Sequence, residues 1–131
     1  MFDNALEGVR ILDLTHHIAG PQCTKLLADY GADVIKVERT SGDPARSMGP
    51  FLNDEPHPEK SGLFLHLNTS KRSITVNLKH ANGIGIVKDL VRECDIVIEN
   101  FRPGVMDDLG LGYDVLEKIN PAVVLTSISN F

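Results

Sequence analysis

Short apolar runs alternate with longer amphipathic stretches along most of the chain. The runs are typical of buried strands, and the stretches repeat apolar side chains at the spacing of a helix. The predicted strands are residues 9–14, 32–38, 73–78, 95–99 and 122–127. The predicted helices are residues 20–30, 81–93 and 113–119. This alternation predicts an α/β, Rossmann-like fold, in which a mostly parallel sheet carries helices on both faces.

The first strand–helix–strand unit, residues 9–39, is the clearest of these units. Gly20-Pro21 marks the start of its helix, because a proline in the first turn has no N–H that needs a partner. The residues predicted to form the buried face of this helix are Cys23, Leu26, Leu27 and Tyr30. Ligands of open α/β sheets bind at the carboxyl ends of the strands, so residues 15–19 and 38–39 are candidates for a binding site.

Residues 40–61 form the one long stretch without helix or strand periodicity, and they contain several glycines and prolines. A loop of this length inside a compact domain is uncommon and is often functional, although a solvated insertion is an equal alternative. Residues 63–67 are apolar but of undefined type, whereas residues 105–109 fit a single helical turn.

Composition and charge exclude several classes of protein. A chain of 131 residues with 42% hydrophobic residues is expected to form one globular domain. A net charge of −5, 5% aromatic residues and no Trp argue against nucleic-acid binding. The sequence contains no apolar run near the ~20 residues of a membrane span, so we expect no membrane partner. The two cysteines, together with an N-terminus that lacks signal-peptide features, predict reduced thiols in a cytoplasmic protein.

Several common site motifs are absent. The turn after the first strand reads T-H-H-I-A-G-P instead of G-x-G-x-x-G, so a nicotinamide cofactor is not expected. No P-loop and no G-x-S-x-G elbow occur either. His16 and His17 have no Cys, Asp or Glu partner at metal-ligand spacing, which predicts no metal site. Cys23 is expected to be a core residue and not a nucleophile.

Basic residues stand at the ends of several predicted strands. Arg39, Lys79 and Arg102 each follow a strand, and parallel neighbours would bring some of them to one edge. Cations that converge in an acidic protein suggest an anionic ligand such as a phosphate. The alternative is that each is a lone solvated charge. Lys71 and Arg72 precede a strand and are expected to be surface charges or partners for acids in the loop.

Four stretches in a fixed order resemble the family III coenzyme A (CoA) transferases, which include formyl-CoA and carnitine CoA-transferases. These stretches are T-H-H-I-A-G-P through V-I-K-V-E-R (15–39), N-T-S-K-R-S-I-T-V-N-L-K (68–79), D-I-V-I-E-N-F-R-P-G-V (95–105) and L-G-L-G-Y-D-V-L (109–116). The resemblance covers nearly the whole chain and implies that residues 1–131 are the N-terminal portion of the large domain of such an enzyme. The α-methylacyl-CoA racemases are similar to this group.

The resemblance also implies a binding site for CoA at the carboxyl ends of the strands. The residues that match the binding positions of the family are His16, Ile18, Ala19, Arg39, Val76, Asn77, Leu78, Lys79, Asn100, Phe101 and Arg102. One position departs from the family, because Asp108 replaces a basic residue that usually reaches a phosphate. Because an acidic side chain at this position would repel a phosphate, we expect either that its loop points away from the ligand or that the affinity for CoA is reduced.

The reaction implied by the resemblance is transfer of CoA from an acyl-CoA to a carboxylic acid, through a covalent aspartyl intermediate. The nucleophilic aspartate is expected beyond Phe131, so we predict no catalytic residue in this chain and no activity of the chain alone. The resemblance further implies an interlocked homodimer. Two alternatives stay open: an isomerase of the racemase type, and a CoA-binding fragment without turnover.

Overall fold

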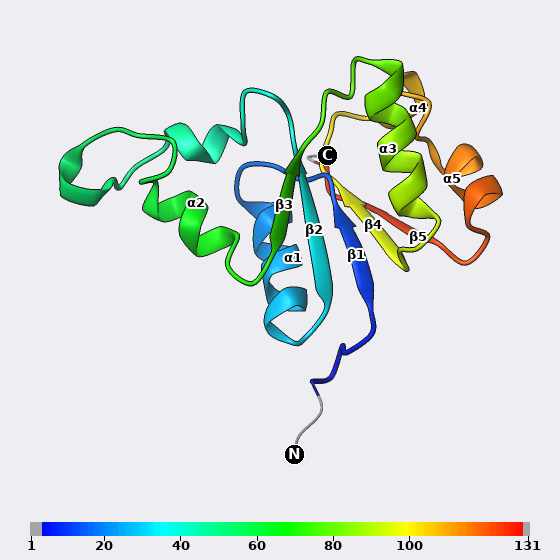
Figure 1. Ribbon diagram of the computed structural model, residues 1–131, viewed down its shortest axis with the longest axis horizontal. Coiled ribbons are helices and arrows are strands. Elements are labelled where there is room, and N and C mark those ends of the chain that lie inside the picture. The colour runs from blue at the N-terminus through cyan, green and yellow to red at the C-terminus, as the bar shows by residue number, and fades with distance from the viewer. Residues whose placement is uncertain (1–3, 130–131) are drawn as a thin grey trace.

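The structure is a computed structural model that describes residues 4–129, and its strands form one five-stranded, all-parallel sheet of order β3-β2-β1-β4-β5 (Figure 1). The strands are β1 (Arg10–Asp13), β2 (Asp33–Glu38), β3 (Arg72–Thr75), β4 (Ile96–Glu99) and β5 (Val124–Ser127). The α-helices are α1 (Ala19–Asp29), α2 (Gly62–Leu67), α3 (Ala81–Val91), α4 (Val105–Asp108) and α5 (Tyr113–Ile119). The predicted parallel α/β fold is therefore confirmed.

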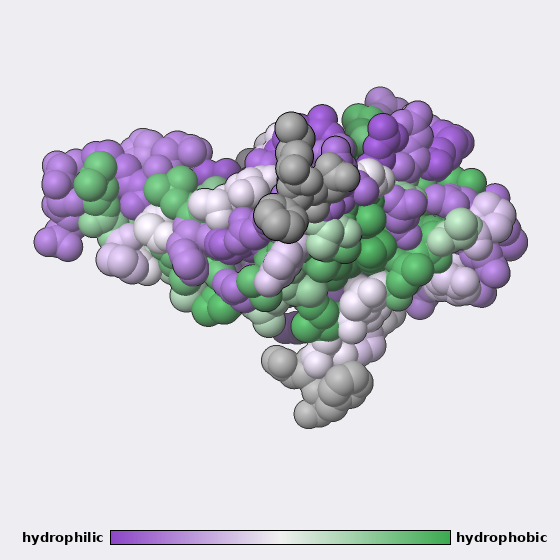
Figure 2. Space-filling view, turned by 90° about the horizontal axis from the view of Figure 1, so that it is seen from below, coloured by the Kyte–Doolittle hydropathy of each residue, from purple (hydrophilic) through white to green (hydrophobic). Residues whose placement is uncertain are grey.

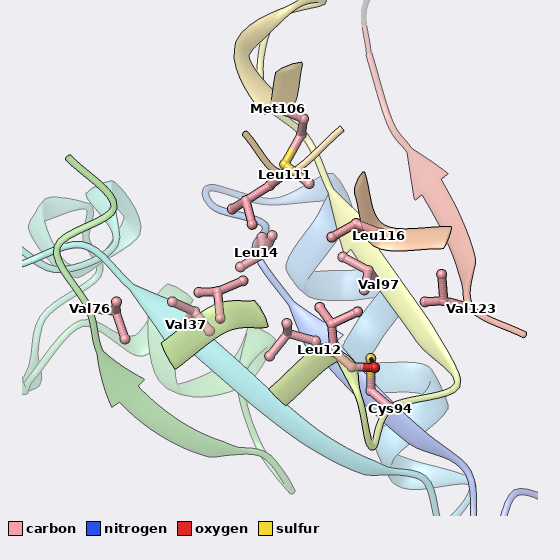
Figure 3. Packing of buried hydrophobic residues seen from close by; sticks show 12 residues of the cluster. Leu12, Leu14, Val37, Val76, Cys94, Val97, Met106, Leu111, Leu116 and Val123 are labelled. Atoms are coloured by element: carbon pink, nitrogen blue, oxygen red, sulfur yellow. Dashed lines mark hydrogen bonds between the residues drawn. The ribbon is translucent and has the colours of Figure 1, made fainter. Parts of the chain in front are cut away.

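Alternate side chains of the central strands pack on opposite faces of the sheet. Ile11 and Val34 belong to the core cluster on the side of α1. Leu12 and Val97 belong to the larger cluster, which α3 and α5 cover through Val87, Val91 and Leu116 (Figure 3). Because successive strand residues point to opposite faces, each central strand contributes to both clusters. The sheet thus carries helices on both faces, as predicted.

The buried face of α1 differs from the predicted one. Leu26 and Tyr30 are 48% and 62% exposed, whereas Thr24 and Ala28 are buried against the sheet. Thr24 Oγ1 donates a hydrogen bond to Asp13 Oδ2 at 2.6 Å, which ties this side of the helix to β1. The predicted apolar face was therefore wrong in part. The small residues Thr24 and Ala28, and the hydrogen bond from Thr24 to Asp13, determine which side of the helix packs against the sheet.

The predicted strand over residues 73–78 is shorter than expected. Parallel pairing with β2 ends at Thr75, although the backbone N–H of the next residue, Val76, still donates to Glu38 O at 2.8 Å. Val76 is nevertheless in the core, and Leu78 packs against the same cluster, so the predicted apolar alternation describes the packing beyond the strand. Residues 105–109 contain the predicted helical turn, α4.

The segment between β2 and β3 forms an arm that projects from the sheet (Figure 1). It contains two 3₁₀ helices, η1 (Pro44–Ser47) and η2 (Leu52–Asp54), followed by α2. An antiparallel bridge joins Phe51, just before η2, to Ser61, just before α2. The arm is mostly polar on the side shown in Figure 2, whereas hydrophobic residues gather over the middle of the molecule. Within residues 4–129, no helix is long and apolar enough to cross a membrane.

Candidate functional site at the carboxyl edge of the sheet

A pocket of about 200 Å³ lies at the carboxyl ends of β1 and β2, beside the residues that follow β4. Its walls combine an apolar part, Leu14 and Val37, with the polar groups of Thr15 and Asp43. Four of the residues predicted to bind CoA also line it: His16, Arg39, Leu78 and Phe101. The structure therefore brings together residues from separate stretches of the sequence.

The turn after β1 is fixed by an asparagine from the neighbouring strand end. The backbone N–H of His16 donates to Asn100 Oδ1 at 2.9 Å, and Asn100 Nδ2 donates to His16 O at 2.8 Å. The rings of His16 and Phe101 lie with their centroids 5.7 Å apart. Burial, followed by the neighbouring His17, lowers the pKa of His16 from its usual value. The imidazole is therefore neutral near pH 7 and able to donate or accept a hydrogen bond.

Two acidic residues that line the pocket, Glu38 and Asp43, are both held by other groups of the protein. Glu38 accepts hydrogen bonds from Arg46 Nε and Nη2 at 2.7 and 2.8 Å and from Ser73 Oγ at 2.8 Å. Asp43 accepts from the backbone N–H of His17 at 3.1 Å, and its Oδ2 lies 2.8 Å from Lys36 Nζ. Burial by itself would raise the pKa of each carboxyl, but these contacts outweigh burial. They lower the pKa of both Glu38 and Asp43, and the pKa of Glu38 falls to about 2.

Arg39 is an available cation that lines this pocket. Its side chain is exposed, and Nε donates to Gly42 O at 2.9 Å. In the described part of the chain, no carboxylate forms an ion pair with it. A guanidinium that is held through Nε but keeps its other donors accessible suits a phosphate group.

The remaining predicted binding residues do not line this pocket. Ile18 and Ala19 are exposed at the start of α1, and Asn77, Lys79 and Arg102 lie in the segments that follow β3 and β4. Val76 is only 5% exposed, so its side chain belongs to the core. Asn100, Phe101 and Arg102 also line an adjoining hollow of about 290 Å³. Asp108 is exposed on α4 and does not line the pocket.

Sequence reasoning missed Lys36 and Asp43. The side chains of both are 1% exposed, and Lys36 also donates to Thr15 O at 2.9 Å, directly beneath the turn that carries His16. The only signal in the sequence was a lysine inside the apolar run Ala32–Val37. A buried lysine needs a carboxylate partner, but the run itself does not identify that partner.

The prediction that Lys71 is a surface charge was wrong. Its side chain is 1% exposed, and Nζ donates to Asp13 Oδ2 at 3.1 Å, to Pro21 O at 2.9 Å and to Asn68 Oδ1 at 2.9 Å. Asp13 is itself buried inside β1 and needs this cation. Arg72 does lie at the surface, where it pairs with Asp33.

The described residues contain no group of three or more His, Cys, Asp or Glu side chains that could hold a metal ion.

The sequence profile of CoA-transferase family III matches residues 6–131. The chain belongs to this family. Its sequence is 49% identical to succinyl-CoA:glutarate CoA-transferase of Mus musculus and 48% identical to formyl-CoA:oxalate CoA-transferase of Afipia carboxidovorans. These alignments cover 96% and 97% of this chain but only 28% and 29% of the relatives. The chain thus spans less than a third of the length of these CoA-transferases.

Solved structures of family III agree with the observed fold. A CAIB/BAIF family protein from Brucella suis superposes with a TM-score of 0.89 at 39% identity, over 99% of this chain and 34% of that protein. The sheet and its helices are therefore those of the CoA-transferase family III fold, and the predicted resemblance is confirmed.

Proposed function

We propose that residues 1–131 are the N-terminal portion of the large domain of a CoA-transferase, and that the pocket at the carboxyl edge binds CoA. The observation that carries this proposal is the pocket's charge. Its two carboxylates, Glu38 and Asp43, are paired, whereas Arg39 has no ion-pair partner among residues 4–129. The apolar wall of Leu14, Val37, Leu78 and Phe101 suits the pantetheine arm. The relatives, whose names specify CoA transfer, support this ligand.

The binding residues would act in two groups. Arg39 would pair with a phosphate, and Lys79 and Arg102 would add positive charge around the rim. Ile18, Ala19 and Phe101 would cover the arm between the nucleotide and the thiol, and Asn100 would hold the turn that carries His16. The segment 76–79 would meet the adenine end, with the buried Val76 contributing backbone and not side chain.

The reaction proposed is transfer of CoA from an acyl-CoA to a carboxylic acid. An aspartate carboxylate would attack the acyl carbonyl, which expels CoA thiolate and gives a mixed anhydride; the thiolate would then attack the aspartyl carbonyl, which releases the first carboxylate and leaves an aspartyl-CoA thioester. The acceptor carboxylate would attack this thioester, which expels CoA thiolate again and gives a second mixed anhydride. The thiolate would then attack the carbonyl of the acceptor, which releases the new acyl-CoA and regenerates the aspartate. The resemblance to the family implies that this aspartate lies beyond Phe131. Within the chain, the buried acids Asp13, Glu38 and Asp43 are held by other groups. The functional enzyme would be an interlocked homodimer, and residues 1–131 alone would not turn over.

Calorimetric titration of the complete protein with CoA tests the proposal. We expect Arg39→Ala to weaken binding by about 1–3 kcal/mol through loss of a charge-assisted bond. Arg72→Ala is the matched control, because Arg72 is an exposed arginine that lines the hollow at the opposite edge of the sheet. Equal affinity of wild type and Arg39→Ala would remove Arg39 from the site, and a wild-type protein that does not bind CoA would overturn the proposed function.

Hydroxylamine trapping addresses the proposed chemistry. The complete protein, incubated with several acyl-CoA donors and carboxylic acid acceptors, should yield a trapped aspartyl hydroxamate, whereas residues 1–131 alone should yield none. An adduct on any aspartate of this chain would show that the nucleophile is misplaced. Exchange of the α-proton of the acyl group with solvent deuterium, without transfer, would instead support the racemase alternative.

A further inference from the structure

A carboxylate in the wall of the pocket poses a problem for a polyanionic ligand. Asp43 lines the pocket, and the lowered pKa of its carboxyl means that it is ionised at neutral pH. An uncompensated negative charge at this position would repel phosphates across the low-dielectric wall of the pocket. The protein therefore needs either to remove this acid or to neutralise it.

Asp43 cannot simply be replaced by an apolar residue, because it joins three segments next to the pocket: the turn after β1, the end of β2 and the start of η1. Its Oδ1 accepts the backbone N–H of His17 at 3.1 Å and of Ala45 at 2.9 Å. Its own N–H donates to Glu38 Oε2 at 2.9 Å. His17 has a φ of 67°, a left-handed conformation that costs energy for a non-glycine residue and needs support from its surroundings. Asp43 thus holds the turn after β1 against the start of η1.

Lys36 supplies the compensating charge from below the pocket. Its Nζ lies 2.8 Å from Asp43 Oδ2 and donates to Thr15 O at 2.9 Å. Asp43 Oδ2 has no aligned hydrogen bond, so the contact between the two side chains is an ion pair. One ammonium group therefore neutralises the acid and also anchors the carbonyl that precedes His16.

We propose that Lys36 and Asp43 form a positioning pair, in which Asp43 shapes the pocket and Lys36 cancels its charge so that an anionic ligand can enter. The inference rests on the proposed function and deepens it. The simpler explanation is that the pair contributes only to stability. A second buried pair in the same chain, Lys71 and Asp13, offers a matched control, since it is equally buried and neither residue lines the pocket.

The decisive experiment measures the affinity of the complete protein for CoA in a set of charge variants. Lys36→Met leaves a lone carboxylate in the wall, and we expect it to weaken CoA binding at least about tenfold. Lys36→Met/Asp43→Asn removes both charges but keeps an amide oxygen that accepts from His17 and Ala45, so its affinity should return to within about threefold of wild type. Lys71→Met should lower the melting temperature but change the affinity less than about twofold.

A neutral probe separates charge from shape. Pantetheine lacks the nucleotide phosphates, so Lys36→Met should weaken its binding much less than that of CoA, as measured by NMR titration. Equal losses for pantetheine and CoA would indicate general distortion and overturn the role of charge. Wild-type affinity of Lys36→Met, or a double variant no better than Lys36→Met, would overturn the inference as well.

A further pair of variants keeps the inference testable if Lys36→Met does not fold. Lys36→Met/Asp43→Leu is also neutral but lacks the acceptor for His17, so it should bind CoA at least about fivefold more weakly than Lys36→Met/Asp43→Asn. Equal affinities of these two variants would overturn the positioning role. Failure of the wild-type protein to bind CoA would contradict the proposed function itself, whereas wild-type binding with unaffected variants would contradict only this inference.

Discussion

The two edges of the sheet carry similar charges but arrange them in different ways. At the amino edge, a hollow of about 260 Å³ is lined by Arg10 and Arg72, which pair with Glu93 and Asp33 at 3.0 and 2.6 Å. All four of these side chains are at least 43% exposed. At the carboxyl edge, the side chains of the Lys36–Asp43 pair are each 1% exposed, and those of Glu38 and Arg46 are 4% and 17% exposed.

This difference shows why one hollow suits an anion and the other does not. At the amino edge each of the two arginines is already balanced by a surface carboxylate, so neither Arg10 nor Arg72 is left for a ligand. At the carboxyl edge the acids are balanced by cations from below and beside the pocket, which leaves Arg39 unpaired. Removing one partner of a buried ion pair destabilises a protein strongly, whereas an exposed ion pair contributes little to the free energy of unfolding. The two edges should therefore respond very differently to mutation.

The largest effect on stability is expected from the carboxyl edge. Glu38→Ala would remove the acceptor of Arg46 Nε and Nη2 and of the N–H of Asp43, and would leave Arg46 only its exposed partner Glu59 as a carboxylate. We expect a loss of about 3 kcal/mol in the free energy of unfolding, because one partner of a largely buried ion pair is removed. Urea denaturation measures this loss. A loss below about 1 kcal/mol would mean that the Glu38–Arg46 pair behaves like a surface pair.

The acid sensitivity of the protein should depend on the same carboxyl group. Burial would raise the pKa of Glu38, but bonds from Arg46, Asp43 N–H and Ser73 lower it from 4.5 to about 2. A folded-state pKa below the unfolded value means that the stabilisation is present above pH 4.5 and is lost as the pH falls toward 2. The free energy of unfolding of Glu38→Gln should therefore fall less than that of wild type between pH 4.5 and pH 2. Urea denaturation at a series of pH values measures this difference. Parallel declines would assign the acid sensitivity to other carboxyl groups.

Most of the fold could be predicted from the sequence, because the five strands and helices α1, α3 and α5 carry their own periodicity. Residues 63–67, whose type the sequence left undefined, belong to α2. The predicted intervals around Leu12, Val34 and Val97 all contain observed strands, since apolar runs between helices indicate a buried parallel sheet. The end of β3 at Thr75 was not accessible, because residues 76–78 keep their apolar alternation after pairing with β2 has stopped.

The buried charges of the site were not accessible, because their partners are distant in the sequence or lie in irregular segments. Lys71 pairs with Asp13, 58 positions earlier, so neither residue shows its burial locally. Asp43 lies in a stretch without periodicity, and only the fold brings it to Lys36. The location of Arg39 at this edge could be predicted, because a residue directly after a strand is placed by the polarity of the sheet alone.

Two glycines at the start of α3 offer a smaller, paired test near the carboxyl edge. A Cβ at Gly83 would lie 2.1 Å from the backbone oxygen of Asn77, whereas a Cβ at Gly85 would meet nothing within 4 Å. We expect Gly83→Ala to destabilise the protein by about 1–3 kcal/mol through overpacking, and Gly85→Ala to stabilise it by about 1 kcal/mol through helix propensity. Thermal melts compare the two variants. Equal effects would show that the backbone of residues 76–79 moves aside freely.

The smallest effect is expected at the amino edge. Arg72 donates three hydrogen bonds to Asp33: Nε to Oδ1 at 3.1 Å, and Nη2 to Oδ1 and Oδ2 at 2.7 and 2.6 Å. The side chains of Asp33 and Arg72 are nevertheless 43% and 66% exposed. Solvent screens such a pair and the two side chains lose entropy when it forms, so Asp33→Asn and Arg72→Met should each change the free energy of unfolding by at most about 1 kcal/mol. A double-mutant cycle in urea, repeated in high salt, isolates the coupling, and salt should reduce it further. A coupling free energy between Asp33 and Arg72 as large as the stability loss in Glu38→Ala would show that the amino edge is also shielded from solvent. The difference in solvent exposure would then no longer explain why the carboxyl edge retains an unpaired arginine and the amino edge does not.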